Sequence, residues 1–259
     1  MTIPERPEGS EPAEPSRFGA QPAGAGRLFL NRFIFRAWVL GGGALVGGLH
    51  FVNPQFGWET AKGVARGIAA TTGVQIELRG VENLPEEPSI VTPNHASHFD
   101  IVALLGDLPG HNRFAAKKEL FQEPILGAAM KTLGMVPIDR QDPSRSIERL
   151  NRIAAKGQGA FSLIMFPEGT RSPQGGGLQE FKKGAFTLAI QMGRPVVPIA
   201  IHGSDQVMPR GKYLSIYPGR VLVEILAPIP TKGLAYDDRV DLRDQVQARI
   251  LDRVQAFSG

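Results

Sequence analysis

The chain has 259 residues, enough for one well-buried domain of about 200 residues and a short appendage. Its hydrophobic content of 42% is ordinary for a globular protein and excludes a polytopic membrane protein. The absence of cysteine excludes disulfides, cysteine metal ligands and cysteine nucleophiles. The net charge of +4 divides into −2 over residues 1–26 and +6 over the remainder. A basic body favours anionic membranes or phosphorylated substrates, and without an arginine-rich helix or zinc-finger spacing we expect no nucleic-acid partner.

The first 26 residues differ in composition from the rest of the chain. They contain five Pro and four Gly and show no apolar periodicity. Such a segment buries too little apolar surface to offset the entropy lost on ordering. We therefore predict that residues 1–26 form a disordered tail.

Residues 27–72 are predicted to form a helical segment that associates with a membrane. Arg27, Arg32 and Arg36 recur at helical spacing among aromatic and aliphatic residues, as in interfacial anchors. Residues 37–52 carry no formal charge, but as a helix they span only about 24 Å, less than the ~30 Å hydrocarbon core. A helix that lies in or dips into one leaflet is therefore favoured over a full span. The alternative is a core helix of a soluble domain.

From residue 73 onward, strand and helix signals alternate, which is typical of α/β domains. The predicted strands are Val74–Leu78, Ser89–Thr92, Arg113–Ala116, Val136–Ile138, Phe161–Phe166, Val196–Ile201 and Val221–Leu226. The predicted helices are 124–134, 142–157, Lys182–Met192 and a terminal helix with Val240, Val246, Ile250, Val254 and Phe257 on its apolar face. Residues 73–259 are therefore expected to form one α/β domain, with a central mixed sheet flanked by helices.

The segment Asn94–Asp100 places a histidine and a carboxylate where a short strand ends. Four residues separate His95 from Asp100, so one loop or helix start can bring the carboxylate to the imidazole. A histidine has a pKa suited to taking the proton of a hydroxyl nucleophile near neutrality. A carboxylate bonded to the other ring nitrogen fixes the tautomer and stabilises the imidazolium. This spacing alone is weak, because it occurs by chance in many chains.

The segment Phe166–Ser172 begins at the last residue of a predicted buried strand. Its presence makes a functional interpretation of the histidine motif more specific than the His–Asp spacing alone allows. Its Pro and Gly suppress regular structure, so the backbone can approach a ligand closely. Arg171 has planar donors suited to a phosphate, and Glu168 has the chemistry to orient that arginine or to bond a substrate hydroxyl. A second arginine, Arg140, ends another predicted strand, and Lys118 adds charge earlier in the chain.

These segments resemble the conserved blocks of the glycerolipid acyltransferases, in the same order and with similar spacing over about residues 73–228. The four blocks are Asn94–Asp100, Gly134–Arg140, Phe166–Ser172 and Val197–Ile199. The resemblance implies that His95 is a general base and Asp100 its partner, with no acyl-enzyme. It implies that the acceptor's glycerophosphate is held by Arg140, Glu168, Gly169, Thr170, Arg171 and Lys118.

The resemblance also implies the reaction and its setting. An acyl group passes from acyl-CoA or acyl-carrier protein to the free hydroxyl of 1-acyl-glycerol-3-phosphate and forms phosphatidic acid, with no cofactor and no metal. The expected partners are a membrane lipid substrate, the membrane surface and acyl-carrier protein, at the cytoplasmic face of the inner membrane. The alternatives are acylation of lyso-ornithine lipid, another lysophospholipid or a glycolipid, or a non-catalytic lipid-binding protein.

Two other kinds of site are weighed against this one. His95, His98 and Asp100 together suggest a metal site, and hence metal-dependent hydrolysis, but the remaining histidines lie in no obvious ligand motif. A serine hydrolase is disfavoured because the chain lacks a Gly-x-Ser-x-Gly elbow.

Overall fold

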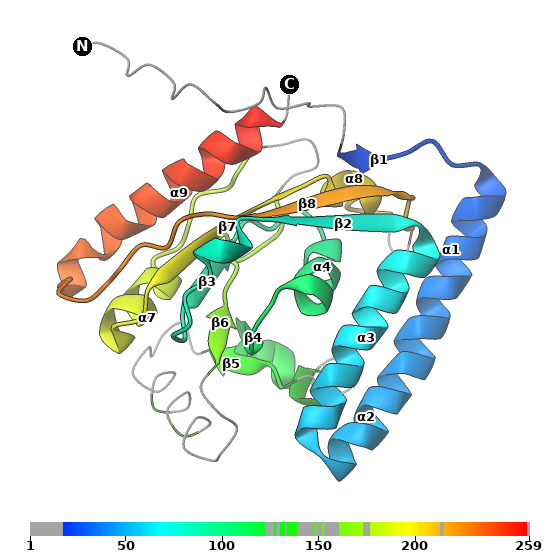
Figure 1. Ribbon diagram of the computed structural model, residues 1–259, viewed down its shortest axis with the longest axis horizontal. Coiled ribbons are helices and arrows are strands. Elements are labelled where there is room, and N and C mark those ends of the chain that lie inside the picture. Colours follow the sequence, from blue (N-terminus) through cyan, green and yellow to red (C-terminus); the bar gives the residue numbers. More distant parts are fainter. Residues whose placement is uncertain are drawn as a thin grey trace.

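The computed structural model describes residues 18–122, 127, 130–132, 134–138, 148, 152, 161–172, 177–212 and 215–257. Within these residues, an eight-stranded mixed sheet lies between two layers of helices, and an N-terminal pair of long helices stands at one side (Figure 1). This arrangement confirms the predicted α/β class with helices flanking a mixed sheet.

The sheet is parallel through most of its width. Its strands are β1 (Gly19–Ala20), β2 (Val74–Arg79), β3 (Ile90–Pro93), β4 (Asn112–Lys117), β5 (Val136–Ile138), β6 (Ser162–Ile164), β7 (Val196–His202) and β8 (Gly219–Ile225). Their order is β1-β8-β7-β3-β6-β4-β5. Strand β2 also pairs with β8, on the edge that faces away from β7. Only the pairs that β8 makes with β1 and β7 are antiparallel among the described strands. The carboxyl ends of β3, β4, β6 and β7 therefore meet at one edge of the sheet, where open α/β sheets bind their ligands.

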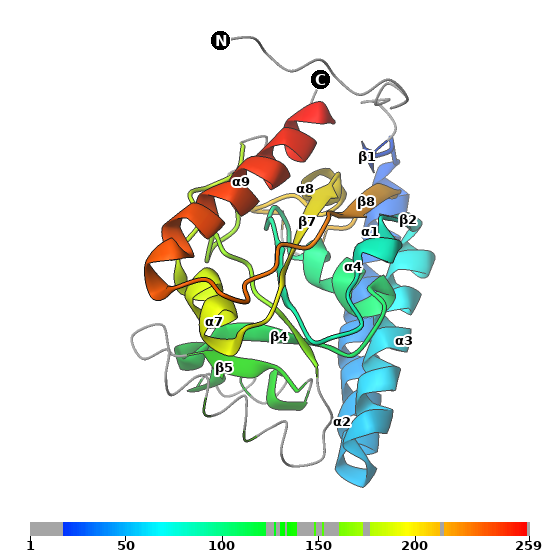
Figure 2. The same ribbon diagram turned by 60° about the vertical axis from the view of Figure 1, so that its left-hand side comes forward.

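The helices are α1 (Ala25–Ala37), the π-helical segment η2 (Trp38–Gly42), α2 (Gly43–Val52), α3 (Pro54–Thr72), α4 (Phe99–Asp107), α7 (Gly184–Met192), α8 (Ser204–Val207) and α9 (Arg239–Ala256), with short 3₁₀ turns η3 (Val81–Asn83), η4 (Lys118–Gln122) and η6 (Tyr236–Asp238). Helices α3 and α4 cover one face of the sheet, and α7 and α9 cover the other (Figures 1 and 2). The side chains of β7 alternate between these two layers.

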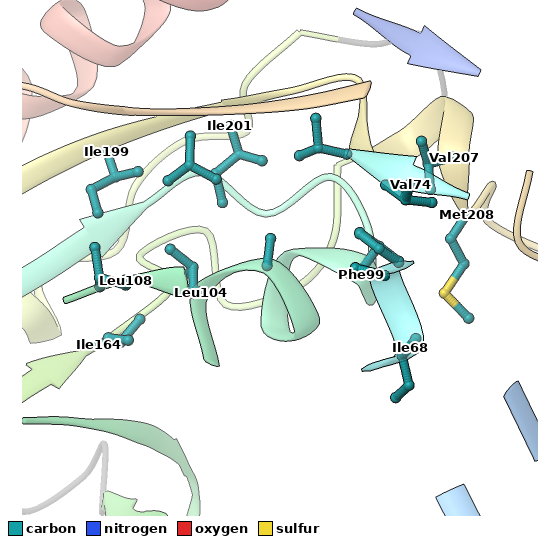
Figure 3. Packing of buried hydrophobic residues seen from close by; sticks show 14 of the residues in the cluster. Ile68, Val74, Phe99, Leu104, Leu108, Ile164, Ile199, Ile201, Val207 and Met208 are labelled. Atoms are coloured by element: carbon teal, nitrogen blue, oxygen red, sulfur yellow. The ribbon is translucent and has the colours of Figure 1, made fainter. Parts of the chain in front are cut away.

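The core on the α4 side packs this helix against the sheet. Leu104 and Leu108 lie under Ile199 of β7, and Phe99 lies at the other end of α4, near Val74 and above Ile68 (Figure 3). Burying one such side chain contributes about 1.5–3 kcal/mol. Because Phe99 belongs to the segment Asn94–Asp100, this packing also anchors that segment.

The N-terminal helices form an antiparallel hairpin. Segments α1, η2 and α2 run as one helix of 28 residues from Ala25 to Val52. Asn53 then breaks it, and its side chain accepts a hydrogen bond from the amide of Gln55 at the start of α3. A Cβ on Gly42 would lie 2.8 Å from Val64 of α3, so glycine permits the close approach of the two arms. The closed end of the hairpin projects away from the sheet (Figures 1 and 2).

Much of the apolar surface of this hairpin is exposed. The exposed large apolar side chains on it are Phe29, Leu30, Phe33, Val39, Leu40, Leu45, Phe51, Val52 and Phe56. By length and composition the helix Ala25–Val52 could cross a bilayer, and only 11% of its most apolar window is buried. At 1.5 Å per residue, these 28 residues extend about 42 Å. The helix is therefore longer than the uncharged residues 37–52, which extend about 24 Å. The low burial distinguishes this helix from the core helix of a soluble domain.

The segment before α1 differs in part from the predicted disorder. Residues 1–17 lie outside the described part of the chain, but Gly19–Ala20 pairs with β8. The close approach depends on glycine, because a Cβ on Gly219 would lie 2.2 Å from the carbonyl oxygen of Gly19. Phe18 packs its ring edge-on against Phe257 of the last helix, with ring centroids 5.7 Å apart. Gly19, one of the glycines that suggested disorder, thus takes part in a strand pairing.

Most of the predicted strands are observed within one or two residues of their expected bounds, and the terminal helix is α9. The helix predicted at Lys182–Met192 begins at Gly184, and α4 was not predicted as a full helix. The helix predicted at 142–157 lies largely outside the described residues, as does most of the one predicted at 124–134. Helix α3 ends at Thr72, and strand β2 begins at Val74.

Candidate active site

The site begins where β3 ends, and a single asparagine fixes that end. The Asn94 side chain donates to the carbonyl of Ile201 at 3.0 Å and accepts from the amide of the same residue at 2.7 Å. It therefore continues the β3–β7 pairing after Pro93, which has no amide hydrogen to donate. The residue after it, His95, leaves the sheet at a defined point on the edge.

His95 and Asp100 form the hydrogen-bonded pair that the spacing predicts. Nδ1 of His95 lies 2.9 Å from Oδ2 of Asp100, and the same oxygen accepts the amides of Ala96 and Ser97, each at 2.9 Å. The Asp100 side chain is fully buried, whereas that of His95 is 13% exposed. The ring of Phe166 stacks on the imidazole with centroids 4.0 Å apart. Because Nδ1 is bonded to the carboxylate, Nε2 is the nitrogen left to meet a substrate.

Glu168 is turned into the protein and joins the two motifs. Its Oε1 accepts the backbone amide of His95 at 2.6 Å. Its Oε2 accepts the Ser172 hydroxyl and, at 3.1 Å, the amide of Gln179. Burial raises the pKa of the Glu168 carboxyl, and these hydrogen bonds offset only part of that rise. Through these hydrogen bonds, Glu168 connects the His95 segment to the loop that contains Ser172 and Gln179.

The third motif turns sharply after β6. The amide of Gly169 bonds the carbonyl of Phe166 at 3.1 Å, and Gly169 has a φ of +72°, which favours glycine. The turn leaves Thr170 exposed and Arg171 half-buried. Beyond it, the amide of Ser172 donates to the carbonyl of His95 at 2.7 Å. Arg171 is therefore held one residue from a direct backbone contact with the His95 segment.

The remaining predicted site residues are placed as follows. Lys118 follows β4 at the same edge of the sheet, two strands from β3. Arg140 lies outside the described residues. The described site residues thus gather at the carboxyl ends of β3, β4 and β6.

The site also contains His98, whose pKa is shifted by its surroundings. Partial burial and then the charge on Arg171 lower the pKa of His98, which caps the start of α4. Within the described part of the chain, no group of three or more acidic, histidine or cysteine side chains is arranged to hold a metal ion.

Two residues at the site were not identified from the sequence. The Gln179 side chain donates to the carbonyl of Arg171 at 2.8 Å, and Arg210 donates to the same oxygen at 3.1 Å. Neither residue belongs to a motif, and Arg210 is 39 residues from its partner. No local sequence signal marks them.

The sheet edge with its His–Asp pair defines an acyltransferase domain, and residues 75–202 match the family model described as Acyltransferase. The chain is 41% identical over 157 residues to the chloroplastic 1-acyl-sn-glycerol-3-phosphate acyltransferase LPAT1 of Arabidopsis thaliana, covering 60% of this chain and 44% of the relative. It is 31% identical over 188 residues to the 1-acyl-sn-glycerol-3-phosphate acyltransferase of Pseudomonas aeruginosa, covering 72% of this chain and 71% of the relative. The chain therefore belongs to the acyltransferase family that contains these enzymes.

A solved structure is also similar. The crystal structure of the 1-acyl-sn-glycerophosphate (LPA) acyltransferase PlsC from Thermotoga maritima superposes with a TM-score of 0.69 at 26% identity, covering 88% of this chain and 95% of that one. The chain spans about half the length of the plant relatives that it matches.

Proposed function

We propose that this protein transfers a fatty acyl group from a thioester carrier to the free hydroxyl of 1-acyl-glycerol-3-phosphate and forms phosphatidic acid. The observation that carries the proposal is the 2.9 Å hydrogen bond between Nδ1 of His95 and Oδ2 of buried Asp100. The printed names of the relatives support the choice of acceptor.

The proposed reaction needs one base and no covalent enzyme intermediate. Nε2 of His95 takes the proton of the acceptor hydroxyl while the hydroxyl oxygen attacks the thioester carbonyl carbon. Asp100 stabilises the imidazolium that forms. When the tetrahedral intermediate collapses, the carbon–sulfur bond breaks and the imidazolium returns its proton to the thiolate. The products are an ester and a free thiol, and His95 is again neutral.

The basic residues at this edge of the sheet are the proposed binding site for the acceptor's phosphate. Arg171 has a planar guanidinium that suits two phosphate oxygens at once, and it is held by the turn that begins at Phe166. Gly169 and Thr170 form the exposed part of that turn. Lys118 and Arg140 are proposed as further ligands of this phosphate. Glu168 acts through the backbone of His95 and Gln179, because its oxygens accept protein donors.

The thioester donor is proposed to be acyl-CoA or acyl-carrier protein, with no cofactor. Both carriers hold the acyl group as a thioester, so the proposed chemistry is the same for each. Measuring transferase activity with each carrier in turn identifies the donor.

We further propose that the hairpin attaches the enzyme to the cytoplasmic face of the inner membrane. Its exposed Phe, Leu and Val side chains would gain favourable burial in lipid, at about 25 cal/mol for each Å² of apolar surface removed from water. Lysine at Phe33, Leu40 and Phe51 together should reduce flotation with anionic lipid vesicles without disturbing the core, since these side chains are 66%, 75% and 94% exposed. Tyr236→Lys, at an exposed site on the far helical layer, is the matched control. Unchanged flotation of the triple variant would refute the attachment.

The activity is tested directly by incubating the full chain with a long-chain acyl-CoA and a panel of lysolipids, with products identified by mass. A diacyl product from lysophosphatidate with the wild type, and none with His95→Ala, is expected. Transfer to another lysolipid would change the acceptor and retain the chemistry. No product with acyl-CoA or acyl-carrier protein would favour a lipid-binding protein.

A further inference from the structure

A basic turn after α8 lies beside the active site but belongs to none of its motifs. Residues Pro209 to Lys212 form the turn, closed by the amide of Lys212 on the carbonyl of Pro209 at 3.3 Å. Gly211 has a φ of +83°, the conformation that a type II turn requires at its third residue. Arg210 therefore occupies the second position of the turn and is exposed.

The base of this turn is attached to the catalytic segment. The buried Ser97 hydroxyl donates to the carbonyl of Met208 at 2.8 Å. The amide of Ser97 also donates to Asp100, so one serine connects the turn to the carboxylate of the His–Asp pair. Met208 is only 5% exposed. The turn therefore has a fixed position relative to His95.

The other end of the same loop is attached to the hairpin. Asn31 of α1 is buried and donates to the carbonyl of Ile216 at 2.8 Å, and Arg32 donates to the Ser215 hydroxyl at 3.1 Å. The loop thus contacts both the proposed membrane attachment and the active site. A lipid headgroup that arrives from the bilayer surface would meet this loop close to the catalytic pair.

Arg210 places a second guanidinium against the backbone of Arg171. Its Nη1 donates to the carbonyl oxygen of Arg171 at 3.1 Å. A guanidinium has five N–H donors, so this single bond leaves donors free for a ligand. Guanidinium groups donate well to phosphate oxygens, so two arginines joined at this turn suit a doubly charged anion.

We propose that Arg210 binds the phosphate monoester of the acyl acceptor together with Arg171, an inference that rests on the proposed function. The phosphate group of a lysophospholipid acceptor and those of CoA have the same chemistry. We assign the acceptor, because the loop that carries Arg210 also contacts the hairpin. A purely structural role, in which Arg210 only braces the Arg171 backbone, is the competing explanation.

The test uses Arg210→Gln in the full chain. Glutamine can still donate a hydrogen bond to the Arg171 carbonyl but carries no charge. The variant therefore keeps the structural contact and removes the proposed phosphate ligand. The KM for lysophosphatidate is expected to rise about tenfold or more, with a smaller change in kcat and none in the KM for acyl-CoA. Arg249→Gln is the matched control, because Arg249 makes the same type of bond, to the carbonyl of Ala227 at 3.2 Å, on the distant helix α9.

A binding measurement separates this proposal from the proposed function. In the His95→Ala background, Arg210→Gln should weaken lysophosphatidate binding about tenfold and leave binding of the monoacylglycerol with the same chain unchanged. Equal weakening for both lipids would indicate a structural role and overturn the proposal. Unchanged lysophosphatidate binding, or a rise in the KM for acyl-CoA alone, would also overturn it. Wild-type protein that binds lysophosphatidate through Arg210 but transfers no acyl group would refute the proposed function alone.

Discussion

Two histidines lie at the carboxyl ends of neighbouring parallel strands, and their surroundings differ. His95 follows β3, and its ring is bonded to Asp100 and partly accessible. His202 ends β7, is 7% exposed, and its Nε2 has no hydrogen-bond partner among the described residues. The Phe257 ring lies 4.5 Å from it, centroid to centroid. The same residue type at the same edge of one sheet is therefore placed in two different environments.

The comparison shows that the packing around each strand end, rather than position on the sheet, decides whether a histidine has a carboxylate partner and access. Burial, with further contributions from Arg253 and Arg79, lowers the pKa of His202 to about 4. Glu224 is already occupied by Arg253, through bonds of 2.9 and 2.7 Å. Burial thus favours the neutral form of His202, whereas the Asp100 carboxylate is bonded to the ring of His95.

The largest effect is expected for His95→Ala. The variant lacks the proposed base, so kcat should fall by about a thousandfold or more. The fold should be retained, because the side chain of His95 contributes one ring contact and one side-chain hydrogen bond. Single-turnover rates and the circular dichroism spectrum check both statements. Residual activity near the wild-type rate would mean that another group is the base.

Asp100→Asn should come next. The variant alters the acceptor for Nδ1 and for the amides of Ala96 and Ser97, so the imidazole loses its fixed tautomer. We expect kcat to fall by about a hundredfold to a thousandfold, measured by initial rates. Asp107→Asn is the control, because Asp107 ends the same helix and pairs with surface Arg66. Equal losses for both variants would indicate general damage to α4.

Glu168→Gln should have a moderate effect. One of the carboxylate oxygens becomes an amide nitrogen that cannot accept from Ser172 or Gln179, and leaving a buried donor unsatisfied costs about 1–3 kcal/mol. We expect a fall in melting temperature and about tenfold lower kcat/KM, with the change mainly in kcat. The exposed Glu180 provides the control Glu180→Gln. A change only in the KM for the acceptor would instead make Glu168 a substrate ligand.

His202→Leu should have the smallest effect on activity and a distinct effect on stability. The pKa of this imidazole is about 4 in the folded protein and near 6.5 when unfolded, so the unfolded chain binds the proton more tightly. Wild-type stability is therefore retained above pH 6.5 and lost as the pH falls toward 4, by about 3 kcal/mol. Free energies of unfolding in urea at pH 7 and pH 4 should show a shallower acid dependence in the variant. An identical dependence in both proteins would contradict the assigned pKa, and exposed His111→Gln serves as the control.

Local sequence predicted the elements with strong patterns. The apolar run at Val196–Ile201 has the composition of a fully buried strand, and β7 is buried along its length. The pair His95 and Asp100 was predictable because one loop and one helix start bring them together over five residues. The contacts of Glu168 with His95 and of Arg210 with Arg171 span 73 and 39 residues, and no local rule gives their orientation.

The sequence by itself therefore determined the α/β class, the His–Asp pair, the basic residues of the motifs and an apolar N-terminal helical region. Those properties follow from residue type and from spacing within one element, where the backbone period decides which side chains share a face. Only the tertiary structure decided that Glu168 points inward, that Gly19–Ala20 pairs with β8, and that Arg210 reaches the site. Each of these depends on which distant segments lie side by side, and it is the packing of strands and helices around the common core that sets those neighbours.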